Sequence, residues 1–234
     1  ANIQKTIIAH VPVTNGQGTL FYLSGGRMRA RDANGAESEA TLGSGPYRAF
    51  GAHGDTLAVI STSAISLYKP GADGRWFTSD DPAAIAYSAS TYGWALNGMH
   101  TPWVGEGKTL AFVQDTSYVW KTVVLDNAGG SAKTVPGNCG VSSGGLHAGV
   151  SARHAAWWGG STVCVAHTGA DGTFGTADDV SAVGLKKYPG STATYCSVKS
   201  MSLSGERLAL LDGTSLYVVD AGTDHVLNTA DDRQ

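Results

Sequence analysis

Short apolar runs occur in pairs at five places along the chain, and polar turn residues separate the two runs of each pair. Leu57-Ala-Val-Ile, for example, is followed by Ile65-Ser-Leu-Tyr. Runs of this kind, rich in β-branched and aromatic residues and bounded by Gly, Ser, Asp or Thr, are typical of β-hairpins. The five predicted hairpins pair residues 20–23 with 27–30, 57–60 with 65–68, 110–113 with 118–121, 155–158 with 162–165, and 208–211 with 216–219.

The fold class follows from the spacing of these hairpins. No window shows a sustained helical period, and 32 glycines in 234 residues disfavour helices throughout. The hairpins recur about every 47 residues, close to the length of a four-stranded propeller blade. We therefore expect an all-β chain that forms one domain over residues 1–234, a five-bladed β-propeller with about four antiparallel strands in each blade.

Closure of such a ring requires its first and last blades to meet. The last hairpin has no fourth strand after it, while the apolar run from Ile3 to Val11 has no hairpin before it. We expect this N-terminal strand to close the propeller, by completing the last blade or by starting the first.

Three acidic segments share Asp, Thr and a final Asp-Asp pair at fixed offsets. Calcium takes six to eight oxygen ligands, and a loop that folds back on itself can supply them. In the alternative interpretation the first Asp only starts a turn and the Asp-Asp pair is solvated. The predicted calcium ligands are Asp73, Asp80 and Asp81 in the first segment, Asp171, Asp178 and Asp179 in the second, and Asp224, Asp231 and Asp232 in the third.

The second segment, Asp171-Gly-Thr-Phe-Gly-Thr-Ala-Asp-Asp, resembles the Asp-Gly-x-Phe-Gly-Thr-x-Asp-Asp calcium-type repeats of extracellular bacterial β-propeller proteins. The resemblance implies a structural calcium ion at the rim of the propeller. Two copies depart from the pattern. Phe77 replaces the second glycine of the first copy, and His225 replaces the turn glycine of the third.

A nitrogen-bearing side chain stands eight to ten residues before the first apolar run of every repeat. Since inner strands line the central channel of a propeller, these side chains are predicted to converge at the axis. A ring of this composition suits an anionic ligand, and its three imidazoles suit a transition metal. The alternative is that polar side chains only line a solvated channel. The five residues are His10, Arg48, His100, His147 and Lys199.

Aromatic residues in the connections between blades are a third candidate group. On exposed loops they would stack on sugars, whereas between blades they would pack in the core, as we expect of Trp120, Trp157 and Trp158. The connection residues concerned are Tyr92, Trp94, Trp103, Tyr188 and Tyr195. Four histidines outside the ring, His53, His154, His167 and His225, are expected in turns or at the surface.

Charge and composition limit the partners. A formal net charge of −3 with 15% charged residues argues against nucleic acid or an anionic membrane as the main partner. No stretch reaches the roughly 18 apolar residues of a membrane span. Low charge, many small residues and the absence of an initiator Met suggest a mature chain that is secreted or periplasmic and has lost a signal peptide.

The three cysteines allow a disulfide in an oxidising compartment. Cys139 and Cys196 each precede the inner strand of consecutive blades, so they are expected on the same face and could pair. Cys164 would then be a buried free thiol. In the alternative, all three are unpaired small apolar residues.

Two functions from different classes fit these features. The first is a secreted, calcium-stabilised binding module for a carbohydrate, an anionic ligand or an extracellular partner protein. The second is a polysaccharide lyase acting on acidic sugars, in which Arg48 or a metal neutralises the substrate carboxylate and a His or Tyr removes a proton. Carboxylate-based glycoside hydrolysis is disfavoured because no paired acids stand on the inner strands.

Overall fold

A computed structural model describes residues 12–40, 47–96, 101–136, 139, 147–187, 191–195 and 197–233. Within these residues the chain forms five antiparallel sheets in sequence order. The first contains β1 (Val13–Thr14), β2 (Leu20–Ser24), β3 (Arg27–Arg31) and β4 (Glu37–Ala40). The second contains β5 (Ala49–His53), β6 (Thr56–Ile60), β7 (Ala64–Tyr68) and β8 (Ile85–Ser88).

The third sheet follows a single helical turn, α1 (Ala89–Tyr92). It contains β10 (Trp103–Val104), β11 (Lys108–Asp115), β12 (Trp120–Asp126) and β13 (Lys133–Thr134), and β9 (Trp94–Ala95) pairs with β11. The fourth contains β14 (Ala148–Val150), β15 (His154–Trp158), β16 (Val163–His167) and β17 (Val180–Gly184). The fifth contains β18 (Val198–Ser204), β19 (Arg207–Asp212) and β20 (Ser215–Asp220).

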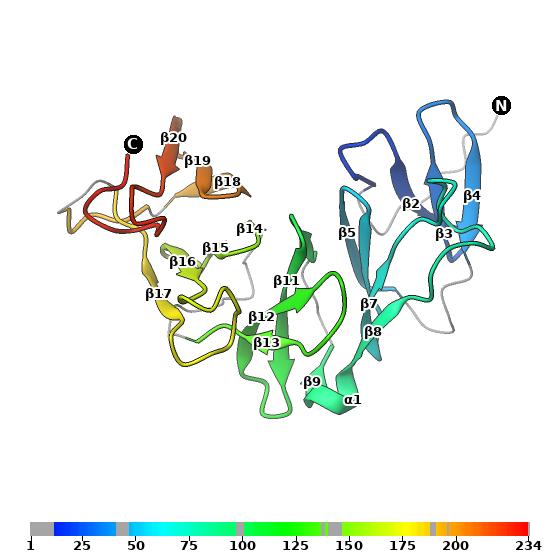
Figure 1. Ribbon diagram of the computed structural model, residues 1–234, viewed down its shortest axis with the longest axis horizontal. Coiled ribbons are helices and arrows are strands. Elements are labelled where there is room, and N and C mark those ends of the chain that lie inside the picture. Colours follow the sequence, from blue (N-terminus) through cyan, green and yellow to red (C-terminus); the bar gives the residue numbers. More distant parts are fainter. Residues whose placement is uncertain are drawn as a thin grey trace.

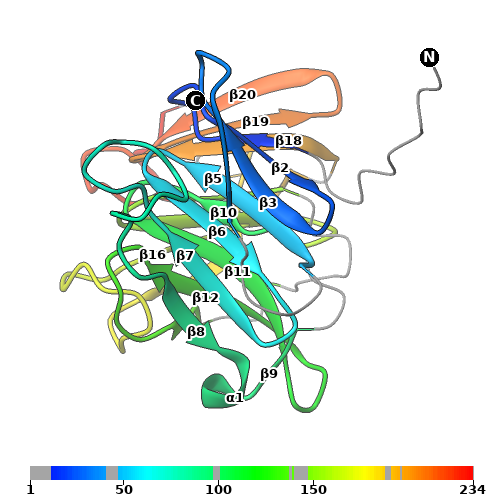
Figure 2. The same ribbon diagram turned by 90° about the vertical axis from the view of Figure 1, so that its right-hand side faces the viewer.

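The five sheets lie side by side in an arc, with the first and the fifth at its two ends (Figure 1). In the side view the strands of the second sheet lie next to β2 and β3 (Figure 2). Apart from the pairing of β9 with β11 in the third sheet, each sheet is a simple meander, in which neighbouring strands are neighbours in sequence. The prediction of an all-β chain built from consecutive hairpins is confirmed.

The predicted hairpin positions agree with the observed strands in four of the five sheets. In the third hairpin the second strand begins at Trp120, because Tyr118 lies in the turn with a positive φ of 60°. The Asp115 carboxylate holds this turn by accepting hydrogen bonds from the backbone N–H groups of Ser117 and Val119. An aspartate that organises its own turn in this way ends the strand earlier than the apolar pattern suggests.

Four apolar clusters of buried residues fill the junctions between consecutive sheets. Phe21 and Leu57 lie in the cluster between the first and second sheets, and Ile65 and Val113 in the next. Phe112 and Trp157 join the third sheet to the fourth, and Val163 and Leu208 join the fourth to the fifth. Because alternate residues of a strand point to opposite faces, a middle sheet contributes to two clusters at once.

The innermost strands of neighbouring sheets approach closely at glycine positions. A Cβ atom at Gly149 of β14 would lie 2.7 Å from the Cβ atom of Leu203 in β18, and one at Gly105 would overlap the carbonyl of Val150. Real Cβ atoms do not make such contacts, so the third sheet can pack this closely on the fourth, and the fourth on the fifth, only because these residues are glycine.

The outward face of the first sheet differs from these junctions because it is covered by charges. Arg29 of β3 lies 3.5 Å from Glu37 and 3.3 Å from Glu39 of β4, while Arg27 pairs with Glu39 and Arg31 with Glu37. A face of this composition is suited to water, as in the terminal units of repeat proteins.

Closure of the ring stays a prediction. Residues 1–11, which carry the predicted closing strand, lie outside the described residues. Among the described residues, no apolar cluster joins the fifth sheet to the first. The described part of the chain also contains no helix of the length and hydropathy needed to cross a membrane.

The predicted pairing of the cysteines is wrong for Cys164. Cys139 and Cys164 form a disulfide, with their Cα atoms 5.9 Å apart. Cys164 lies in β16 on the face that packs against the third sheet, and Cys139 packs against the same cluster. The junction between sheets, rather than the shared face expected for Cys139 and Cys196, brings the two sulfurs together. Cys196 lies outside the described residues.

Candidate functional site

Three of the five predicted axial residues lie in the described part of the chain. Arg48 directly precedes β5, His147 directly precedes β14, and Lys199 is the second residue of β18. His10 and His100 lie outside the described residues. Arg48 and Lys199 are exposed and His147 is half-buried.

The inner strands bring these three side chains to one end of the sheets. At the opposite end, a cavity of about 290 Å³ is lined by residues at or just beyond the ends of inner strands, among them His53, Glu106, Ser151 and Ser204. Since these C-terminal ends meet around one cavity, the inner strands run in the same direction. Their N-terminal ends therefore also share one end of the structure.

The acidic segments form loops that hold themselves together through their aspartates. In the first loop the Asp81 carboxylate accepts hydrogen bonds from the backbone N–H groups of Gly71 at 3.0 Å and Phe77 at 2.6 Å. Asp80 accepts from the N–H of Asp73 at 3.3 Å. Equivalent bonds to the Asp-Asp pair occur in the second and third loops.

In every loop the two carboxylates converge on one threonine. The Thr78 hydroxyl lies 2.6 Å from an oxygen of Asp80 and 2.9 Å from an oxygen of Asp81, and Thr176 and Thr229 do the same in the other loops. The threonine hydroxyl is the main reason why the pKa of Asp80 is lowered. The loops thus gather anionic oxygens at one point.

The fit of these loops to calcium is partial. Their carboxylate oxygens converge as a hard cation requires, but several already accept hydrogen bonds from the loop itself. Among the described residues no three His, Cys, Asp or Glu side chains form a group that could hold a metal ion. Calcium would have to use the remaining lone pairs together with backbone carbonyls or water.

The third loop keeps the geometry of the other two despite its different sequence. His225 has a positive φ of 60°, close to the 70° and 68° of Gly74 and Gly172 at the same position. Asn228 likewise has a positive φ of 75°, as Gly175 does at the equivalent place. The substitution of glycine by His225 therefore leaves the turn unchanged in form, although a non-glycine residue is strained there.

An apolar residue anchors each loop in the junction with the preceding sheet. Trp76 is 4% exposed and meets Phe21 of the first sheet edge to face, with ring centroids 4.8 Å apart. Phe174 and Leu227 are equally buried, in the clusters shared with the third and fourth sheets. Each loop therefore clamps its own sheet onto the sheet before it.

Polar contacts reinforce the clamp formed by the third loop. The backbone carbonyl of His225 lies 3.1 Å from Nε2 of His154 in the fourth sheet. The side-chain oxygen of Asn228 accepts a hydrogen bond from the N–H of Lys186 at 2.9 Å, just beyond β17. These bonds join residues that are far apart in sequence and fix the fifth sheet relative to the fourth.

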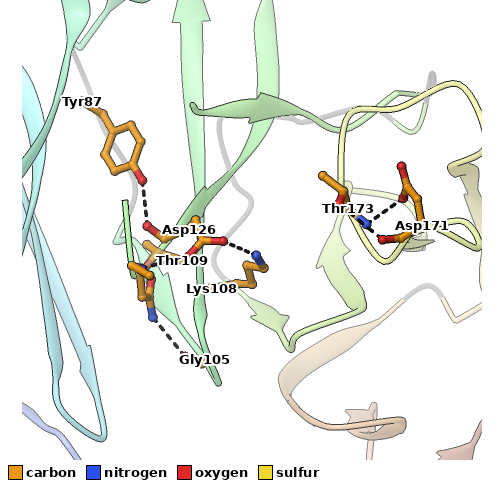
Figure 3. A network of polar contacts seen from close by, with 9 residues as sticks. Tyr87, Gly105, Lys108, Thr109, Asp126, Asp171 and Thr173 are labelled. Carbon is orange, nitrogen blue, oxygen red and sulfur yellow. Dashed lines mark hydrogen bonds and ion pairs between the residues drawn. The ribbon is translucent and has the colours of Figure 1, made fainter. Parts of the chain in front are cut away.

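The junction between the second and third sheets is held without an acidic loop. The Tyr87 hydroxyl of β8 donates to the carbonyl of Asp126 at 2.7 Å, while the Asp126 carboxylate pairs with Lys108 at 2.5 Å (Figure 3). Burial raises the pKa of Tyr87 to about 12, so this donor keeps its proton at neutral pH. Asp171 and Thr173 of the second loop appear in the same view.

The aromatic residues in the connections between sheets pack against the core. Tyr92 and Trp94 stack on each other with ring centroids 4.7 Å apart and lie against the core between the second and third sheets. Trp103 packs against the next cluster, and Tyr195 is fully buried. The structure thus rules out sugar stacking for Tyr195 and shows Tyr92, Trp94 and Trp103 half-buried against the core, while Tyr188 lies outside the described residues.

The prediction that His154 lies in a turn or at the surface is also wrong. It is 1% exposed, in β15, with its ring 6.1 Å from that of His167. Nδ1 of His154 and Nε2 of His167 are buried and have no hydrogen-bond partner. Sequence reasoning missed this pair because histidine gives no apolar signal, and only the docked loop buries it.

The loop anchors were also missed, although the sequence contained a signal for them. All three loops carry a large apolar residue three positions after the first aspartate. A repeated apolar residue inside an otherwise polar loop indicates a buried contact.

No family model and no curated protein matches this sequence. Solved β-propeller structures resemble its fold. Hsv2 of Kluyveromyces lactis matches with a TM-score of 0.52 at 12% identity, over 89% of this chain and 60% of that one. AztD of Citrobacter koseri gives 0.47 at 12% identity, over 90% and 61% of the two chains. The N-terminal domain of Nup159 gives 0.43 at 9%, over 94% and 59%.

This likeness concerns the fold alone. The chain has the meander sheets of a β-propeller protein, as the match to Hsv2 shows. It spans about 60% of the length of the matched Hsv2 structure. The closed five-bladed ring stays a prediction.

Loss of a loop anchor should weaken the junction between sheets. We expect Leu227→Ala to lower the free energy of unfolding by about 2 to 5 kcal/mol, because it removes a buried side chain at a site that cannot collapse. Leu216→Ala is the matched control, since Leu216 is 70% exposed and its loss should cost no more than about 0.5 kcal/mol. Urea unfolding of both variants tests this, and equal losses would contradict the clamp.

The buried histidine should make stability depend on pH. Burial lowers the pKa of His154 below its ordinary value of 6.5, and the nearby His167 lowers it further. Its partner carbonyl on His225 and the charge of Glu206 act in the opposite direction, while Arg153 adds to the lowering. The unfolded chain therefore binds this proton more tightly than the folded chain does.

Stability should be full above about pH 6.5 and fall as the pH drops toward the folded-state pKa, by up to about 1.4 kcal/mol per pH unit. We expect His154→Gln to flatten this dependence in melting curves recorded between about pH 7.5 and about pH 5.5. His53→Gln, at an exposed residue, should leave the slope unchanged. An undiminished slope in His154→Gln would show that other groups cause it.

Proposed function

We propose that this chain is a propeller-type binding module for an anionic ligand, with acidic carbohydrate as the ligand class. The observation that supports the proposal is the position of Arg48, His147 and Lys199, each at the N-terminal start of an inner strand. Among the described residues, the side chains of these three make no hydrogen bond or ion pair. Cations without partners on the protein are available to a carboxylate or sulfate of a ligand.

The absence of such contacts among the described residues favours binding over catalysis. A general base needs a partner that orients it and tunes its proton affinity. Within the described residues no such partner contacts His147 or Lys199. In the described part of the chain no contact therefore supports the lyase alternative. Electrostatic recognition requires only the charges of the side chains. We also propose that His10 and His100 lie near these three residues.

The module is proposed to work outside the cytoplasm. A disulfide between Cys139 and Cys164 supports this, because such bonds form and persist in oxidising compartments. Calcium is the proposed partner of the acidic loops, where two carboxylates converge on one threonine and repel each other in the absence of a cation. Its role would be to stiffen the loops that clamp the sheets.

Ligand binding can be tested with oligogalacturonate, using a neutral cello-oligosaccharide as the reference. We expect calorimetry to detect binding of the acidic oligomer only. Arg48→Gln and Lys199→Gln should each weaken it at least about tenfold, or about 1.4 kcal/mol. Lys121→Gln is the matched control, because Lys121 is a partly exposed cation already paired with Asp115. Equal binding of both sugars, or equal affinity in all variants, would contradict the proposal.

Calcium can be tested separately by metal analysis and by melting with and without chelator. Saturating calcium at about 100 times its dissociation constant should stabilise the chain by about 2.7 kcal/mol per site. Asp179→Asn should reduce both the bound calcium and the stabilisation, while Asp32→Asn, in a turn outside the acidic loops, should change neither. A chain that retains no calcium and melts identically in chelator would rule out the site.

A further inference from the structure

One face of the fifth sheet is not covered by any described residue. Its strand register places nine side chains on this face, which we call the fifth-sheet face: Ser200, Ser202 and Ser204 of β18, Arg207, Ala209 and Leu211 of β19, and Leu216, Val218 and Asp220 of β20. Leu216 is 70% exposed and Val218 39%. The opposite face, with Leu208 and Leu210, is buried against the fourth sheet.

The corresponding face of the fourth sheet shows what normally covers such a surface. There, Ala156 pairs with Val165, in the register in which Ala209 pairs with Val218 in the fifth sheet. Ala156 and Val165 are almost fully buried because the fifth sheet packs on them. The fifth-sheet face thus has the same strand register as the buried face of the fourth sheet, but no described residue packs on it.

The position on which an acidic loop rests, which we call its seat, is repeated as well. In the fourth sheet the paired residues His154 and His167 lie under the third loop, and only about 70 Å³ of space remains beside them. In the fifth sheet Arg207 pairs with Asp220 at the same register position. A cavity of about 690 Å³ opens over this pair.

The seat on the fifth sheet also has the charge to receive an acidic loop. Arg207, Arg233 and His225 line the cavity, together with Asp220 and Glu206, which pair with two of them. The occupied seat on the fourth sheet holds two histidines, His154 and His167. Both seats therefore offer nitrogen-bearing side chains at the place where a loop can rest.

A second copy of this chain is a poor candidate for the occupant. Its three acidic loops are already seated, since Trp76, Phe174 and Leu227 are each buried in their own molecule. The outward face of its first sheet is a lattice of Arg and Glu side chains, which would be desolvated on contact with Leu216 and Val218.

We propose that the fifth-sheet face is a docking surface for a further β-sheet unit that carries an unseated acidic loop of the same type. The apolar residue of that loop would enter the junction beside Val218, and its aspartates would lie near Arg207 and Arg233. The sheet of the partner would cover Leu211 and Leu216, as the fifth sheet covers Trp158 and Val163. This proposal is independent of the axial ligand site, and it is the alternative to closure of the ring by the first sheet.

The test supplies such a unit in the chain itself. A copy of residues 181–233 is attached after Arg233. Arg233 then follows the third loop as Val180 follows the second, and the appended segment continues from it. Tethering keeps the unit at a high effective concentration. We expect hydrogen exchange of the β20 amides to slow at least about tenfold relative to a chain extended by residues 181–187 alone, which supplies only the outer strand beside β20, in line with a gain of about 1.4 kcal/mol.

Two control variants show whether the loop seat is responsible. An appended copy carrying Leu227→Asp, or an extended chain carrying Leu216→Lys in its original fifth sheet, should lose the protection of β20. Unchanged exchange in the extended chain would overturn the proposal, since the same unit already packs on the fourth sheet. Protection that survives both variants would overturn it too, as would a concentration-dependent dimer of the unextended chain that Leu216→Lys dissociates.

Discussion

The insertion of one apolar loop side chain into the groove beside the preceding sheet is the interaction on which the arrangement of the chain depends. A four-stranded meander with apolar residues on both faces is not stable alone, because half of its apolar surface would face water. Trp76, Phe174 and Leu227 add a buried anchor at the outer part of the junction. The inner part is fixed by the close approach of strands at Gly105 and Gly149.

These anchors also give the stack a direction. Each loop reaches back to the sheet before it, so each new sheet is fixed by contacts that it supplies itself. Where the loop is missing, at the third sheet, the Tyr87 hydroxyl bonds across the junction to the carbonyl of Asp126, whose carboxylate pairs with Lys108 within the sheet. Half-buried polar contacts of this kind depend on exact partners, whereas an apolar anchor tolerates Trp, Phe or Leu. This difference explains why the loops vary at that position without changing shape.

The sequence was sufficient to predict the hairpins because period-two patterns and turn residues are local signals, readable at Leu57 to Tyr68 without knowledge of the rest. It was not sufficient for features created by the meeting of two sheets. The pairing of Cys139 with Cys164 and the burial of His154 both arise at junctions. The axial residues are intermediate, since alignment of the repeats found the starts of the inner strands at Arg48, His147 and Lys199, whereas their convergence at the axis stays a prediction.

Within the described residues the directional stack has two unlike end sheets, and their charges reflect this. The first sheet turns a lattice of Arg and Glu side chains outward, which resists contact with an apolar surface and limits association at that end. The fifth sheet presents Leu216 and Val218 beside a polar seat. Because the inner strands run the same way, Arg48, His147 and Lys199 all lie at the strand ends opposite the cavity of about 290 Å³. Any unit added at the fifth sheet would therefore also extend the wall around the proposed ligand site.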